Sequence, residues 1–130
     1  MISDLIGVLK NKPGFVSMIA ATDVQIQDAE ARLDVSFGED YRAYVGAFGA
    51  AAFEGHELTG ISKSSRLNVV DVTLTERAKH PDMPSDWYVI EQLHIDDVSI
   101  WQSASGEVFQ FVPGHAPEKI ADSLIGYVNG

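Results

Sequence analysis

Two short helical patterns follow each other in the first half of the chain, and they constrain the fold more than any other stretch. Thr22 and Gln25 have the spacing of a capping box, in which each side chain satisfies a backbone amide of the other residue. A helix is therefore predicted to begin directly after Thr22. Ile26, Ala29 and Leu33 fall on one face of it, as the buried side of a surface helix requires.

The second pattern carries an aromatic stripe. Ser36 and Glu39 repeat the capping spacing, which predicts a second helix with Asp40 in its first turn, where the helix dipole favours negative charge. Its apolar positions follow the i, i+3, i+4, i+7 rule and are Tyr41, Tyr44, Val45 and Phe48, with Gly49 placed to end the helix. This spacing favours a core role for the aromatic residues over a binding role.

The segments around these two helices are less uniform. Ile2, Leu5, Ile6 and Leu9 have helical spacing, and Pro13 with Gly14 ends that predicted first helix. Residues 15–20, FVSMIA, are consistent with either a strand or a buried helix.

The middle of the chain also leaves an alternative open. Residues 53–61 have the character of an irregular strand or of a strand and turn. Residues 68–81 combine β-branched residues, which favour a strand, with Asn68 as a helix cap and Val70, Leu74 and Ala78 at helical spacing.

The second half is predicted to supply most of the sheet. Residues 87–93, WYVIEQL, favour a strand, and residues 97–112 contain two strand patterns around a turn at Ser105 and Gly106, which predicts a hairpin. Pro117 suits the first turn of a closing helix, whose predicted face is Ile120, Leu124, Tyr127 and Val128.

These elements predict one domain over residues 1–130 with an α+β fold. The sheet is expected to be antiparallel or mixed, with about four to six strands, and to have the N-terminal helices and a C-terminal helix packed against it. At 130 residues and 45% apolar composition, the chain is long enough to bury a core without disulfides or a structural metal. It contains no cysteine, which excludes thiolate metal sites and thiol nucleophiles.

The charge balance restricts the partners. Nineteen Asp and Glu against nine Lys and Arg give a net charge of -10, so direct binding to nucleic acid is not expected. An acidic surface confers solubility, and it also suits the capture of a basic protein. The N-terminal residues lack a basic leader and no long apolar run follows, which favours a cytoplasmic protein without membrane contact.

The chain resembles the SUKH superfamily, in particular its SMI1/KNR4 branch. The likeness covers roughly residues 24–128, and it rests on the order and spacing of short fragments rather than on any one motif. These include FGEDYRAYVGAFG, GHELTG, VVDVT followed by Arg77, the strand of Val89 and Ile90, GEVFQF and IADSLIGYV. The single residues that match the family pattern, for which a structural role is expected, are Glu30, Leu33, Asp40, Tyr41, Tyr44, Phe48, Gly49 and Trp87.

The resemblance implies a non-catalytic immunity protein. Bacterial members of the family resemble immunity proteins that bind and neutralise a cognate toxin of a polymorphic toxin system, often a nuclease. A monomer or weak homodimer without a cofactor is expected. Fungal members imply an alternative, a regulatory or scaffold module of the same fold that binds other proteins.

An enzyme is a third hypothesis, and it is weaker. His56 with Glu57, and His94 with Asp96 and Asp97, group imidazoles with carboxylates, but neither has the HExxH spacing of a zinc site, and no phosphate loop or GxSxG motif occurs. The acids are better explained as surface residues. Glu54, Glu57, Asp96 and Asp97 are the predicted contacts for a basic partner, because exposed connections often carry recognition.

Overall fold

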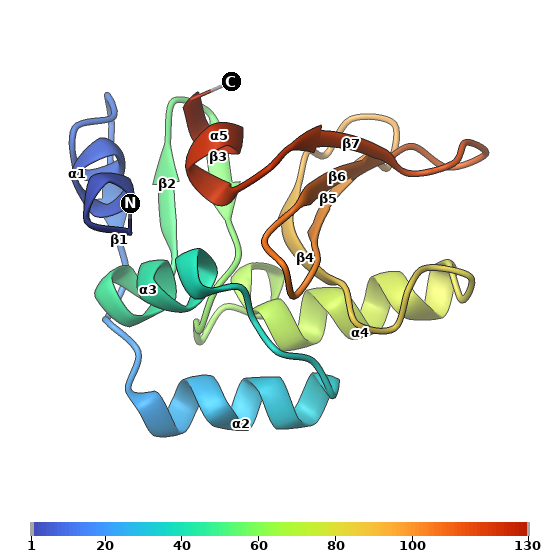
Figure 1. Ribbon diagram of the computed structural model, residues 1–130, viewed down its shortest axis with the longest axis horizontal. Helices are drawn as coiled ribbons and strands as arrows, with labels where there is room; N and C mark the ends of the chain where they lie inside the picture. The colour runs from blue at the N-terminus through green and yellow to red at the C-terminus, as the bar shows by residue number, and fades with distance from the viewer. Residues whose placement is uncertain (1, 130) are drawn as a thin grey trace.

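A seven-stranded antiparallel sheet organises the computed structural model, which describes residues 2–129 and the side chains of residues 4–129 (Figure 1). Its strands are β1 (Val16–Ser17), β2 (Ala51–Phe53), β3 (His56–Leu58), β4 (Tyr88–Gln92), β5 (Ser99–Gln102), β6 (Val108–Phe111) and β7 (Glu118–Ala121). The helices are α1 (Ile2–Lys10), α2 (Asp23–Leu33), α3 (Glu39–Phe48), α4 (Val69–Lys79) and α5 (Leu124–Asn129), with a 3-10 turn η1 (Ser65–Leu67) before α4. The predicted α+β class is confirmed, although seven strands exceed the expected four to six.

Each strand pairs with the next one in the sequence, so successive connections alternate between the two ends of the sheet. The turn between β2 and β3 consists of Glu54 and Gly55, whose φ angles of 45° and 80° are those of a tight hairpin turn. The β4–β5 loop lies at the same end of the sheet as this turn. The predicted hairpin around Ser105 and Gly106 is confirmed as β5 and β6, and its turn lies at the opposite end.

The sheet has an inner face, which packs against α1, α3 and α5 and carries the main core. Tyr88, Ile90, Ile100 and Val108 point to this side, and their side chains are at most 1% exposed. The outer face is the opposite side of β4–β6. It carries a smaller cluster of Val89, Trp101 and Phe111 packed against Val72 of α4 and against Met83, which follows α4.

Three helices form where the sequence predicts them. Thr22 caps α2, with both hydrogen bonds of the capping box to Gln25 present. Ile26, Ala29 and Leu33 are buried, as are Tyr41, Tyr44, Val45 and Phe48 of α3, so the aromatic stripe belongs to the core. In α1, Leu5 and Leu9 are buried and Ile6 is partly buried, while the side chain of Ile2 lies outside the described residues.

The predicted cap of α3 is wrong. The helix begins after Gly38, and Ser36 makes no capping hydrogen bond. Partners from other elements take the neighbouring amides. The Phe37 N–H donates to Glu30 at 2.8 Å, and the Gly38 N–H, which a Ser36 cap could have reached, donates to the Tyr88 hydroxyl at 2.8 Å. Partners distant in the sequence therefore replaced the local cap.

Residues 68–81 form a helix, which decides the open alternative. Asn68 caps α4 as predicted, accepting hydrogen bonds from the Val70 and Asp71 amides. The predicted face is wrong beyond Val70, because Leu74 is 47% exposed and Ala78 is exposed. The buried positions that set the orientation of the helix are Val69, Val72, Thr73 and Glu76.

The closing helix is shorter than predicted. Residues 118–121 form β7 and pair with β6, so Pro117 precedes a strand and Ile120 is 41% exposed. The helix α5 starts at Leu124, which is buried together with Val128. Three residue pairs with the neighbouring strand β6 outweighed a helical pattern that only its second half satisfies.

The ambiguous segment FVSMIA is neither a long strand nor a buried helix. Only Val16 and Ser17 join the sheet, as its edge strand β1, and Val16, Met18 and Ile19 are exposed. In the part of the chain that the structure describes, no helix has the length and apolar character needed to cross a bilayer.

Candidate functional site

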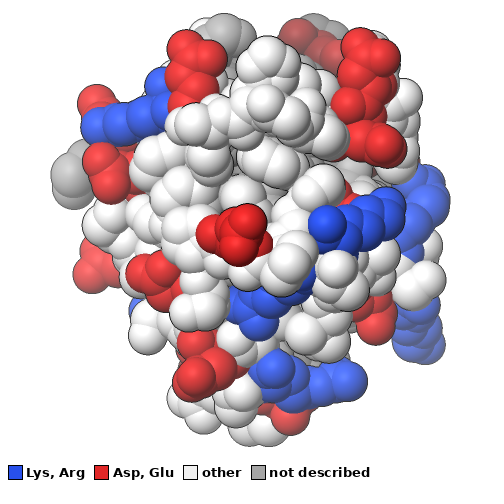
Figure 2. Space-filling view, turned by 90° about the vertical axis from the view of Figure 1, so that its right-hand side faces the viewer, with Lys and Arg blue, Asp and Glu red and all other residues white. Residues whose placement is uncertain are grey.

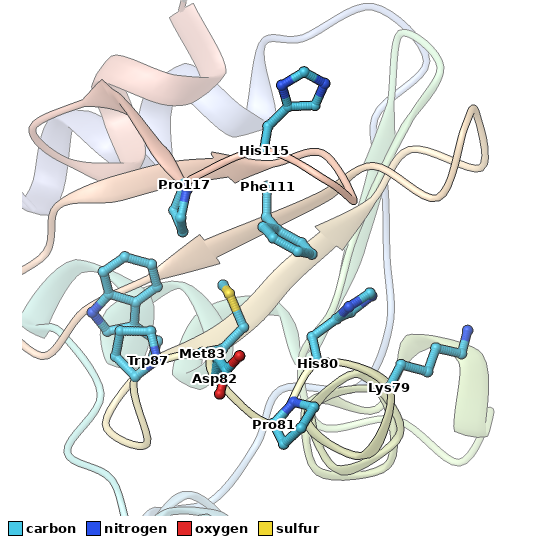
Figure 3. Close-up of a pocket in the computed structure, with 10 residues that line it drawn as sticks. Lys79, His80, Pro81, Asp82, Met83, Trp87, Phe111, His115 and Pro117 are labelled. Carbon is cyan, nitrogen blue, oxygen red and sulfur yellow. The ribbon is translucent and has the colours of Figure 1, made fainter.

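A cavity of about 600 Å³ opens on the outer face of the sheet (Figure 3). We call it the outer-face pocket. Its lining combines the C-terminal end of α4, the segment that connects α4 to β4, the end of β6 and the β6–β7 connection, and it includes His80, Asp82, Met83, Trp87, Phe111 and Pro117. Figure 3 shows Asp82 and Met83 between Trp87 on one side and His80 on the other, whereas His115 points away from them.

The sequence HPDMPSDW, residues 80–87, builds one wall of this pocket. Pro81 cannot continue α4, and two tight turns follow, in which the Met83 amide donates to the His80 carbonyl and the Trp87 amide donates to the Pro84 carbonyl. These turns place Met83 over the sheet, where it is 9% exposed. Both prolines limit the freedom of the segment, so the wall is formed before any partner binds.

Arg77 attaches this wall to the rest of the fold. Its guanidinium donates to the Leu33 carbonyl at the end of α2 at 3.1 Å and to the Ser85 carbonyl at 2.8 Å. A longer hydrogen bond of 3.4 Å reaches the Trp87 carbonyl. Burial lowers the pKa of Arg77, and the nearby Asp34 carboxylate opposes this effect.

Aromatic contacts hold the floor of the pocket. The Trp87 indole stacks on Phe109 with ring centroids 4.0 Å apart and an interplanar angle of 13°. The His80 ring meets Phe111 edge to face at 4.7 Å. Beneath them Trp101 is completely buried and donates its indole N–H to the Ser99 hydroxyl. The floor is therefore rigid and mostly apolar.

Charged groups are sparse in the pocket itself. Lys79 at its edge pairs with the buried Glu76 at 3.4 Å, while Asp82 has no ion-pair partner among the described Lys and Arg residues. Figure 2 shows this side of the molecule, where an acidic residue lies near the centre of the face and Lys or Arg side chains lie to its right and below it, separated by uncharged surface. Apolar side chains therefore dominate the lining of the pocket, which also includes Lys79 and Asp82.

The four predicted contact acids lie at one end of the sheet or next to it, but they are not equivalent. Glu54 is in the β2–β3 turn, and Asp96 and Asp97 are in the β4–β5 loop at the same end; all three are exposed. Glu57 on β3 accepts two hydrogen bonds from Arg66, at 2.8 and 2.9 Å. Arg66 lowers the pKa of Glu57, mainly through these hydrogen bonds, and its charge balances that carboxylate.

The β4–β5 loop also has an unusual backbone. His94, Asp96 and Asp97 have φ angles of 58°, 53° and 56°, in the left-handed region that residues other than glycine, asparagine and aspartate avoid. The HIDD segment is thus an exposed loop, as the sequence predicts.

His56 takes part in a network of hydrogen bonds around the buried carboxylate of Glu91. A bulge in β4 after Val89 turns Glu91 to the inner face, where its buried carboxylate accepts hydrogen bonds from the Glu57 amide at 2.9 Å and from the Tyr127 hydroxyl. The His56 Nδ1 lies 3.0 Å from the same carboxylate. The three contacts join β3, β4 and α5, and they satisfy Glu91 fully. In the described residues, no group of three His, Asp or Glu side chains is arranged to hold a metal ion.

Comparison with protein-family models identifies the fold. The model SUKH_5, described as SMI1-KNR4 cell-wall, matches residues 2–130. The chain belongs to this SMI1-KNR4 family. No curated protein matches it in a sequence search.

The residues that match the SMI1-KNR4 pattern mostly join elements of the fold. The Asp40 carboxylate accepts hydrogen bonds from the Tyr41 amide at 2.7 Å, from the Gln102 side chain at 3.1 Å and from the Leu124 amide at 2.7 Å, so it links the start of α3 with β5 and the start of α5. Glu30 likewise accepts from the Phe37 amide and from Arg42.

Gly49 permits a close approach of two chain segments. Its φ is 72°, and a Cβ atom at this position would lie 2.0 Å from the Ile19 carbonyl oxygen.

Trp87 differs from the other residues that match the family pattern because it lines the outer-face pocket. Sequence reasoning singled out Trp87 but missed Asp82, Met83 and Phe111, although two prolines around an isolated methionine in HPDMPSDW indicate a structured apolar loop.

Proposed function

We propose that this SMI1-KNR4 protein is a cytoplasmic immunity protein, which binds a basic toxin domain, in particular a nuclease, and blocks it by occlusion without catalysis. Family membership is the observation that carries the proposal. A nuclease has to present a basic surface to phosphate, and an acidic protein can occupy that surface through charge complementarity.

The distribution of charges on this chain supports capture of a basic partner. Nineteen carboxylates face nine cations. Four of these cations, Arg42, Arg66, Lys79 and Lys119, are held in ion pairs with the chain's own acids. Most of the remaining carboxylates are exposed and are left to interact with solvent or a partner.

Glu54, Asp96 and Asp97 are the proposed contacts of this partner. They lie at one end of the sheet, and no ion pair joins them to a described Lys or Arg. Glu57 is the weakest of the four predicted contacts, since Arg66 already binds it. A partner cation would have to compete with that pair.

The test is coexpression with the toxin encoded beside the gene, scored by survival and by copurification. Reversing Glu54, Asp96 and Asp97 to Lys is expected to slow association and to flatten its dependence on salt, because charge steering acts mainly on the association rate. Reversal of Asp28 and Asp71, exposed acids on α2 and α4, is the control for reversal of Asp96 and Asp97 alone, since both change the net charge equally, and it should change the rate less. Equal effects of the two sets would reject these contacts, and a failure of the wild-type protein to protect cells would reject the immunity function.

The alternative is a regulatory or scaffold module that binds other proteins of its own cell. The cell-wall term in the family description favours it. Gene neighbourhood separates the two proposals: an adjacent gene for a large exported protein with a toxic C-terminal domain supports immunity, whereas a solitary gene supports the regulatory module.

A further inference from the structure

We propose that the outer-face pocket binds an arginine side chain of the basic protein partner. This inference rests on the proposed function and adds to it a defined contact and the chemistry of the residue that fills it. None of the four acids predicted from the sequence lines this pocket, so it is a second contact surface.

The apolar part of the pocket suits the stem of an arginine side chain. Met83 and Phe111 form a floor that is only 9% and 8% exposed. Long cationic side chains pack their methylene groups on such surfaces while the charged end stays at the water margin. The cavity of about 600 Å³ is larger than one such side chain needs, and it is open to the outside.

Trp87 is placed to bind the guanidinium group at the end of the arginine side chain. One face of its indole is stacked on Phe109, which fixes the ring, and the indole also lines the pocket. Guanidinium groups stack on aromatic rings, and tryptophan is the best aromatic partner for a cation. Because the ring is already held in place, little freedom is lost when a cation binds.

Asp82 supplies the complementary charge. It is the carboxylate among the lining residues, and no described Lys or Arg pairs with it. Lys79 pairs with Glu76, and Figure 3 shows its side chain directed away from Asp82. The protein therefore has an aromatic surface and a carboxylate in one cavity, and Lys79, which also lines the cavity, is paired with Glu76 instead of Asp82.

Other occupants fit less well. A purely apolar anchor would cover Asp82 without giving it a counter-charge, which costs free energy. An anionic ligand would meet both Asp82 and a protein of net charge -10. An arginine satisfies the apolar floor, the indole and the carboxylate together.

The chain offers a built-in probe for this pocket. It has two tryptophans; Trp87 lines the pocket, whereas Trp101 is completely buried and bonded to Ser99. The two indole N–H signals in a ¹⁵N NMR spectrum therefore give one reporter and one internal control. The ligand in the titration is the peptide acetyl-Gly-Arg-Gly-amide. The control peptide has citrulline in place of arginine, because citrulline has the same shape without the charge.

Titration with the arginine peptide is expected to move the Trp87 signal saturably and to leave the Trp101 signal in place. The dissociation constant should be about threefold or more lower than for the citrulline peptide. Asp82→Asn keeps the shape of the side chain and is expected to lower this ratio, leaving the part that the Trp87 ring contributes. Asp28→Asn, on exposed α2, is the matched control and should preserve the ratio.

Three results would overturn the proposal: no saturable movement of the Trp87 signal, equal affinity for the two peptides, or an unchanged ratio in Asp82→Asn. These titrations need no toxin, so they fail independently of the immunity experiment. Protection of cells without arginine binding would refute only the pocket, and arginine binding without protection would refute only the immunity function.

Discussion

The inner and outer faces of the sheet differ in how their buried polar groups are partnered. On the inner face the buried or partly buried carboxylates of Asp40 and Glu91 each accept several hydrogen bonds. Beside the outer face, the Glu76 Oε2 and Arg77 Nε atoms are buried without a hydrogen-bond partner in the described part of the chain. The outer cluster is also smaller and opens to solvent at the pocket.

This difference distinguishes the two faces of the sheet. A satisfied polar network specifies a single arrangement of α1, α3 and α5 on the sheet, because each member is costly to leave unpaired. The outer face holds α4 through a smaller apolar cluster, and part of its apolar area lines the open pocket. The proposed arginine contact lies on the outer face for this reason.

Raising the pH should lower the free energy of unfolding through the tyrosines of the inner face, and this is the largest expected effect. All four tyrosines of the sequence lie there, and burial raises the pKa of each above its ordinary value of 10.0. Above pH 10 the unfolded chain loses these protons while the folded chain keeps them, so the free energy of unfolding falls as pH rises. The slope is about 1.4 kcal/mol per pH unit for each tyrosine.

Urea unfolding followed by circular dichroism at pH 8, 10 and 11 measures this slope. Tyr127→Phe, which keeps the ring and removes the ionisable hydroxyl, should reduce the slope by about one proton. A free energy of unfolding that stays constant up to pH 11 would contradict the placement of the tyrosines.

Matched substitutions of two buried glutamates compare the faces directly. Glu91→Gln replaces a carboxylate that accepts from Tyr127 and from the Glu57 amide, and it is expected to cost about 2–3 kcal/mol of unfolding free energy. Glu76→Gln on α4 changes a group whose Oε2 atom has no hydrogen-bond partner and only a long ion pair, of 3.4 Å, with the exposed Lys79. It should cost less than about 1 kcal/mol, since it also removes the burial cost of a charge. Urea unfolding at pH 7 measures both, and equal losses would refute the contrast between the faces.

Arg77→Lys tests whether a single side chain positions the outer-face pocket. Lysine keeps the charge but cannot reach the Leu33, Ser85 and Trp87 carbonyls together, so a loss of about 1–2 kcal/mol is expected. The Trp87 indole signal should shift and broaden, while the Trp101 signal should remain in place. Movement of both signals would mean that Arg77 supports the whole outer cluster and not the pocket wall.

The sequence predicts most strongly where local signals agree with tertiary packing. Thr22 with Gln25 forms a capping box because nothing else competes for those amides. Ser36 with Glu39 has the same spacing, yet α3 starts elsewhere, since Glu30 and Tyr88 reach the adjacent amides from other elements. A spacing rule cannot detect such competition.

The same limit explains the missed parts of the site. Residues 118–121 form a strand because β6 offers free backbone groups, and no feature of the segment itself reports them. The pocket combines the segment after α4 with β6 and the β6–β7 connection, so its existence depends on how α4 crosses the sheet. That orientation follows from Val72 and Thr73, not from the Leu74 face that the sequence favours. Trp87 was found because it matches the family pattern.

The smallest expected effect concerns the Glu57–Arg66 pair, which belongs to neither face. Both side chains are well exposed, at 35% and 57%, and exposed pairs add little to stability. Arg66→Ala should therefore change the melting temperature by less than about 2 °C at pH 7. Arg66 lowers the pKa of Glu57, so the contribution of the pair is present above the ordinary value of 4.5 and is lost as pH falls below it.

Calorimetry of the wild-type protein and Arg66→Ala at pH 7 and pH 3 separates these states, and any difference at pH 7 should be smaller at pH 3. A difference of the same size at pH 3 would show that Arg66 acts by packing and not by charge. A large difference in melting temperature at pH 7 would show that the Glu57–Arg66 pair is held firmly before any partner binds. Glu57 would then be unavailable to a partner, and Glu54, Asp96 and Asp97 would remain as the contacts.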